Sequence, residues 1–175
     1  MAKKMKTKKL IYCALFAAII AIMSQIAVPI QPIPLNMGIF GVLLCGGLLG
    51  KKYSAASVIV YILLGMVGVP VFSGFRGGLG VIAGPTGGYI AGYIIIAFIT
   101  GMVCEKTRKI KYMALFMTLS VILCYVVGTA WYCILMKTNI VSALMLCVIP
   151  FIPGDLVKVI LAVMVLKNGK LRIES

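Results

Sequence analysis

The sequence has no histidine, and only three of its 175 residues carry a carboxylate side chain. The absence of histidine excludes imidazole acid–base chemistry and most zinc sites. The three carboxylates, Glu105, Asp155 and Glu174, are too few for a carboxylate-rich metal centre. We therefore expect no metal ion, no cofactor and no enzymatic activity.

Charged residues of either sign are also scarce. They make up 11% of the chain, whereas 63% of the residues are hydrophobic and the mean hydropathy is +1.17. A soluble domain has about 25% charged and about 45–50% apolar residues. The composition therefore predicts a membrane protein that lies in a lipid bilayer. We expect residues 1–175 to form one all-α domain, and at about 20 residues per crossing their number allows a bundle of six transmembrane helices.

The six cysteines show no CxxC pair and no regular spacing. Each lies in or beside an apolar run, which is typical of buried thiols that neither bind metal nor form disulfides.

Basic residues outnumber acidic ones by seventeen to three. They form no basic face with interleaved aromatic residues, so we expect no nucleic-acid partner. Fourteen of the seventeen lie in short clusters at residues 1–9, 51–52, 106–111 and 167–172. Clusters of this kind mark cytoplasmic loops. The pattern predicts a multi-pass protein of the cell membrane with both termini in the cytoplasm.

The apolar runs between these clusters are interrupted by proline and glycine. The first run is too long for the apolar part of a signal peptide, so we interpret it as a spanning helix. Pro29, Pro32 and Pro34 indicate a rigid external loop after it. The predicted helices cover residues 10–30, 36–49, 53–67, 85–104, 112–136 and 155–166, with a short helical arm at 140–149.

Residues 68–84 form a glycine-rich segment that we expect to be an external loop, and it contains Arg76. Non-helical backbone at membrane depth is tolerated only where it lines a cavity or is covered by protein. The pattern favours a lid that closes on a binding site. A flexible connector is the alternative.

Asp155 and Lys158 stand in the stretch that opens the last helix, directly after Pro153 and Gly154. Positions three apart share one helix face, so both side chains can point into one cavity. Ionised residues within a membrane are costly and usually mark a ligand or ion path. The alternatives are a structural ion pair and a lysine that reaches toward the interface.

Small residues recur four apart on the first helix, as Ala14 with Ala18 and Ala17 with Ala21. Such pairs let another helix approach closely. The pattern does not distinguish a docked partner subunit from packing within the protein.

Four stretches together resemble the BioY family, the biotin-specific substrate-binding (S) components of energy-coupling-factor transporters. They are ALFAA at 14–18, GVPVF at 68–72, GPTGGY at 84–89 and PFIPGDLVK at 150–158. The resemblance implies high-affinity capture of biotin from outside and its uptake into the cell. It also implies two kinds of partner, a transmembrane coupling subunit and ATPase subunits. By the same resemblance, Ala14 and Ala18 would dock the coupling subunit.

The resemblance places Asp155 and Lys158 in the biotin site. Asp155 would accept a hydrogen bond from a ureido N–H, and Lys158 would donate to the ureido carbonyl. Arg76 would pair with the carboxylate of biotin, although Lys158 in that role is an open alternative. The other expected binding residues are Trp131, which would pack on the bicyclic ring, and Thr86, Tyr89 and Asn36.

Asn36 and Gly38 depart from the family, which tends to have Thr and Gln at these positions. Other functions also remain as alternatives: an S-component-like binder of a thiamin or riboflavin class vitamin, a small intramembrane enzyme, or a structural membrane subunit without a ligand.

Overall fold

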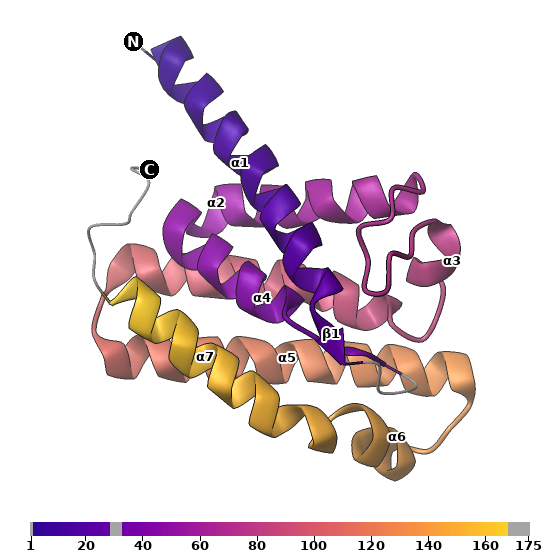
Figure 1. Cartoon of the computed structure of the whole chain (residues 1–175). Helices are drawn as coiled ribbons and strands as arrows, with labels where there is room; N and C mark the ends of the chain where they lie inside the picture. Colours follow the sequence, from indigo (N-terminus) through magenta and orange to yellow (C-terminus); the bar gives the residue numbers. More distant parts are fainter. Residues whose placement is uncertain (1, 29–32, 168–175) are drawn as a thin grey trace.

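The computed structural model describes residues 2–28 and 33–167, and most of them are helical (Figure 1). The elements in chain order are α1 (Ala2–Gln25), β1 (Ala27–Val28), β2 (Leu35–Asn36), α2 (Gly38–Met66), α3 (Leu79–Ile82), α4 (Gly87–Lys106), α5 (Ile110–Met136), α6 (Ile140–Cys147), the 3-10 turn η1 (Ile149–Phe151) and α7 (Ile152–Leu166).

Five helical segments of the described chain are long and apolar enough to cross a membrane. They are Thr7–Gln25, Gly38–Met66, Gly87–Lys106, Ile110–Met136 and Ile140–Leu166. The prediction of a helical, multi-pass membrane protein is confirmed at this level.

Helix α2 is divided at Gly50, whose φ of 75° and ψ of 171° are not helical. This conformation is open to glycine because it has no Cβ. Cys45 Sγ lies 4.0 Å from the carbonyl oxygen of Ser54, whereas nine residues of straight helix would span about 13.5 Å. The chain therefore reverses at Gly50, and its arms at residues 38–49 and 51–66 match two of the predicted helices (Figure 1).

Helix α4 is the most buried of the five apolar segments that are long enough to cross a membrane. It packs against both α2 and α5. Small residues allow the close approach. A Cβ added to Gly46 of α2 would lie 2.8 Å from Thr100 of α4, and one added to Gly92 would overlap Cys124 of α5. The core of the protein is therefore centred on α4.

Helix α1 ends at Gln25, earlier than the predicted end at residue 30. The chain instead forms a short antiparallel ladder in which Ala27 pairs with Asn36 and Val28 pairs with Leu35. Residues 29–32 of the proline loop predicted at 29–34 lie outside the described residues. The ladder matters for function because β2 positions Asn36.

The glycine-rich segment between α2 and α4 contains more structure than the predicted loop. Phe72 and Arg76 pair as an antiparallel bridge, and α3 adds one helical turn. Positive φ angles at Gly74 and Phe75 allow the reversal between the bridge partners. We call residues 71–76 the 71–76 turn.

The last helix begins at Ile152, three residues before its predicted start. Pro153 lies in its first turn, where a missing N–H costs no helical hydrogen bond. The preceding arm is α6, and Asn139 caps it by accepting a hydrogen bond from the Ser142 N–H. Because α7 begins at Ile152, Asp155 lies in its first turn.

Candidate functional site

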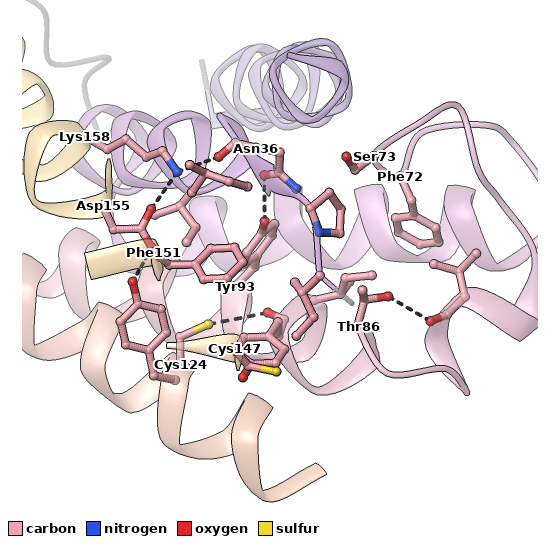
Figure 2. Close-up of a pocket in the computed structure, with 18 of the residues that line it drawn as sticks. Asn36, Phe72, Ser73, Thr86, Tyr93, Cys124, Cys147, Phe151, Asp155 and Lys158 are labelled. Carbon is pink, nitrogen blue, oxygen red and sulfur yellow. Dashed lines mark hydrogen bonds and ion pairs between the residues drawn. The ribbon is translucent and has the colours of Figure 1, made fainter. Parts of the chain in front are cut away.

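One cavity is enclosed by β2, α2, the 71–76 turn, α4, α5 and the start of α7 (Figure 2). It contains about 650 Å³ of unfilled space, including its opening to the outside. Its polar wall comprises Asn36, Ser73, Arg76, Thr86, Asp155 and Lys158, and its tyrosines are Tyr61, Tyr89, Tyr93 and Tyr125. Six of the seven predicted binding residues therefore line one cavity, although they come from four separate parts of the chain.

Asp155 and Lys158 form a buried ion pair in the wall of this cavity. Their residues are 2% and 5% exposed. Lys158 Nζ donates to Asp155 Oδ1 and to the backbone carbonyl of Asn36, at 2.6 Å in each case (Figure 2). A lysine ammonium has three hydrogens, so one donor remains for a ligand.

Tyr125 of α5 provides the second partner of Asp155. Its hydroxyl donates to Asp155 Oδ2 at 2.5 Å. Both carboxylate oxygens therefore have a partner, yet a carboxylate has about four acceptor positions. Asp155 can still accept a hydrogen bond from a ligand N–H.

Asn36 presents an amide group beside this pair. Its Oδ1 accepts hydrogen bonds from the Gly38 N–H at 2.8 Å and from the Tyr93 hydroxyl at 3.2 Å. Its amide nitrogen makes no hydrogen bond to the described residues, so it offers two donors. A Cβ added at Gly38 would lie 2.8 Å from Asn36 Oδ1. The Asn36 side chain thus leaves little room for a longer residue at position 38.

Arg76 and Thr86 lie on the far side of the cavity. Arg76 is exposed and donates through Nε to the Ser73 carbonyl at 3.1 Å. Thr86 donates to the carbonyl of Val81 at 3.3 Å. The terminal nitrogens of Arg76 have no partner among the described residues, so the guanidinium can meet an anion at the cavity mouth.

Tyr89 lines the cavity, and its hydroxyl oxygen lies 3.0 Å from Thr129 Oγ1. Trp131 is the exception among the predicted binding residues, because it is not part of the cavity wall. It is 39% exposed, and its indole N–H donates to the Gly84 carbonyl at 2.9 Å. Trp131 therefore binds the backbone of the segment that leads into α4.

Aromatic side chains that the sequence reasoning did not select cover the apolar part of the cavity. They are Phe72, Tyr93 and Phe151, together with Tyr61. Each stands in an apolar stretch, where an aromatic residue gives no signal that separates a ligand wall from ordinary core.

The two alanine pairs of α1 face different ways. Ala14 and Ala18 are exposed, on the same face as the exposed Leu15 and Ile22. Ala17 is buried, and Ala21 packs against the core. The Ala14 and Ala18 pair is therefore free of packing within the described chain. We call Ala14, Leu15, Ala18 and Ile22 the exposed α1 face.

The described residues contain no group of three or more His, Cys, Asp or Glu side chains close enough to hold a metal ion. The site is instead suited to a small organic ligand, because it combines apolar walls with a few polar groups.

Comparison with known proteins gives concordant matches. A model of the BioY family matches residues 1–174. A probable biotin transporter BioY of Pyrococcus horikoshii is 41% identical over 161 residues, covering 92% of this chain and 95% of the relative. The biotin transporter BioY of Thermotoga maritima is 34% identical over 168 residues, covering 95% and 99%. The crystal structure of the S-component for biotin from an ECF-type ABC transporter matches with a TM-score of 0.88 and 30% identity, over 97% of this chain and 94% of that one.

Proposed function

The chain belongs to the BioY family, and from this membership we propose that it captures biotin with high affinity and takes it up across the cell membrane. It acts as the substrate-binding component of an energy-coupling-factor transporter and is not an enzyme. The observation that carries the assignment to this chain is the buried Asp155–Lys158 pair, which lines a cavity and keeps one lysine donor free.

The groups of biotin match those of the cavity. Its ureido ring has two N–H donors and one carbonyl acceptor, and its valerate tail ends in a carboxylate. In the proposed pose, a ureido N–H donates to Asp155, and the ureido carbonyl accepts from Lys158 and from the Asn36 amide. The contacts to Asp155 and Lys158 are charge-assisted hydrogen bonds, which are roughly twice as strong as neutral ones.

The other end of biotin is proposed to lie toward the 71–76 turn. The carboxylate meets the Arg76 guanidinium at the mouth, and Thr86 and Tyr89 line the intervening wall. The fused rings pack against Phe151 and Tyr93. The reverse pose, with the carboxylate on Lys158, makes Arg76 dispensable for binding.

We further propose the partners and the topology. The exposed α1 face docks a transmembrane coupling subunit, which in turn carries the ATPase subunits. The two arms of α2 count as separate crossings beside α1, α4, α5 and the joined α6 and α7. This gives six crossings and places both termini in the cytoplasm.

Equilibrium binding to the purified protein tests the ligand assignment. We expect tight binding of biotin and no measurable binding of thiamin or riboflavin at the same concentration. Binding of thiamin or riboflavin in preference to biotin would contradict the assignment, and would place the chain among binders of another vitamin.

A further inference from the structure

The side chain of Gln25, the last residue of α1, joins this helix to the 71–76 turn. Its Nε2 donates to the carbonyls of Val71 at 3.0 Å and Phe72 at 3.2 Å, and to that of Ala21 in its own helix at 3.1 Å. Its Oε1 accepts from the Phe75 N–H at 2.9 Å. One amide group thus contacts three residues of the turn from about fifty positions away in the sequence.

The 71–76 turn forms part of the cavity wall. Phe72 and Ser73 line the cavity (Figure 2). Arg76 also lines it and is exposed. The Phe72 ring is held edge-on to Tyr61, with ring centroids 5.5 Å apart, and it lies so close to Gly65 that no Cβ fits there. Because three of its residues line the cavity, a displacement of this turn changes the cavity wall.

The backbone of the turn is under local strain. Phe75 has a φ of 55° and its side chain is 73% exposed. A non-glycine residue in the left-handed region costs on the order of 1–3 kcal/mol. Its side chain makes little contact that could offset this cost, so the Gln25 amide, which accepts the Phe75 N–H, supports this conformation.

We infer that Gln25 is a positioning residue that holds the 71–76 turn over bound biotin and links the opening of this turn to α1. The inference rests on the proposed function. Gln25 is not part of the cavity wall and acts through the turn. Gln25 follows Ala18 by seven residues, or about 10 Å along one continuous helix, so a displacement of α1 on partner docking reaches the turn directly.

The test is the variant Gln25→Met, which keeps the length of the side chain and removes its amide. Two quantities are measured: hydrogen exchange of residues 70–77 in the ligand-free protein, and the dissociation rate of biotin. We expect faster exchange in this segment and roughly tenfold faster dissociation, which corresponds to about 1.4 kcal/mol. The association rate and the thermal unfolding midpoint should change little.

The matched control is Leu10→Met, which makes the same residue at an exposed position of the same helix, outside the exposed α1 face. It should leave both quantities at their wild-type values. A second variant, Gln25→Glu, keeps an acceptor for the Phe75 N–H but places an anionic oxygen toward the carbonyls of Val71 and Phe72. It should also speed exchange and dissociation. If the Met variant fails to fold, this variant tests the role of Gln25 in its place.

The two measurements separate this inference from the proposed function. Unchanged exchange in residues 70–77, or faster exchange with unchanged biotin dissociation, overturns the role of Gln25 while biotin binding stands. If the wild-type protein retains no biotin, the proposed function itself fails, and the role of Gln25 in biotin release fails with it.

Discussion

At the residue scale, Lys158 and Asp155 each use some of their hydrogen-bonding positions within the protein and keep others for the ligand. Two of the three hydrogens of Lys158 are donated within the protein, to Asp155 and to the Asn36 carbonyl. An ionised side chain at membrane depth costs roughly 2.5–3.5 kcal/mol on insertion scales. The internal partners offset part of this cost, and the third hydrogen is left for the ligand. The structural ion pair and the ligand site are therefore compatible properties of one pair.

The first prediction concerns single substitutions of this pair. Asp155→Asn and Lys158→Met each remove a charge-assisted hydrogen bond, a contribution of about 1.5–3 kcal/mol, and leave a buried partner unsatisfied. We expect biotin affinity to fall roughly 10–100-fold or more, at about 1.4 kcal/mol per tenfold. Isothermal titration of the purified variants measures the change.

The double variant of positions 155 and 158 separates a ligand site from a purely structural pair. Removing both charges restores the fold in either case, because no uncompensated charge stays buried. We expect the folded double variant to bind biotin no better than the weaker single variant. Wild-type affinity in a well-folded double variant would exclude the proposed site.

The second prediction concerns Tyr125, which the sequence reasoning did not select. Tyr125→Phe removes the hydroxyl that donates to Asp155 Oδ2, a bond to a charged group that contributes about 1.5–3 kcal/mol. We expect a lower midpoint of thermal unfolding in detergent. Tyr112→Phe, at an exposed position of the same helix, is the control and should leave the midpoint unchanged. Equal midpoints for both variants would show that the hydroxyl contributes nothing.

The sequence was sufficient to predict the ion pair but not its surroundings. Asp155 and Lys158 are conspicuous because charge is rare in this chain, and their spacing alone puts them on one helix face. Tyr125 and Phe151 give no comparable signal, since aromatic residues are ordinary in apolar helices. Trp131 is predicted to pack on the bicyclic ring, yet its indole N–H donates to the Gly84 carbonyl outside the cavity wall, a contact that depends on tertiary packing.

At the element scale, α1 has one face in the core and one face free. Ala17 and Ala14 are equivalent in composition, and only the fold shows that the first is buried and the second exposed. The sequence therefore left partner docking and internal packing as equal alternatives. The exposure of Ala14 and Ala18 favours docking.

The third prediction follows from this face. Ala14→Trp or Ala18→Trp should abolish co-purification with the coupling subunit, because a bulky side chain prevents close helix approach. Biotin binding should persist, since neither residue contributes to the cavity wall. Leu119→Trp, at an exposed position of α5, is the control and should retain the partner. Loss of biotin binding with assembly intact would identify the face as internal packing.

The fourth prediction concerns the reversal within α2. Gly50→Ala places a Cβ at a φ of 75° and into contact with Glu105, whose Oε1 accepts from the Lys51 N–H at 3.0 Å. We expect a loss of about 1–3 kcal/mol or more in stability, measured by thermal unfolding. Gly41→Ala is the matched control, because its nearest neighbour would lie 3.4 Å away, an ordinary contact. Equal stability of the two variants would contradict the requirement for glycine.

Element boundaries were predictable where glycine or charge interrupts an apolar run, as at Gly50 with Lys51 and Lys52. The end of α1 was not, because residues 26–28 are as apolar as the helix before them. What ends the helix is the pairing of β1 with β2, a contact between segments on either side of the proline stretch.

At the scale of the whole molecule, contacts between helices bring together segments that carry basic clusters. Lys9 lies over the Tyr53 ring at 5.1 Å, which brings the start of α1 to the middle of α2. Arg108 donates to the carbonyls of Leu166 and Gly47, which brings the start of α5 to the end of α7. Described segments that carry basic clusters, at Lys9, at residues 51–52 and at Arg108, thus lie near one another or near the end of α7.

The last prediction assigns a side of the membrane to each end. Because basic clusters are retained in the cytoplasm, Lys3→Cys and Arg172→Cys should react with an impermeant thiol reagent only after permeabilisation. Phe75→Cys, at the exposed tip of the 71–76 turn, should react in intact cells and serves as the matched control. Of the native cysteines, Cys133 alone is not buried, so a Cys133→Ser background keeps the labelling specific. Reaction of either terminal cysteine in intact cells would contradict six crossings with cytoplasmic termini. Protection of Phe75→Cys in intact cells would instead invert the orientation and place the biotin cavity toward the cytoplasm.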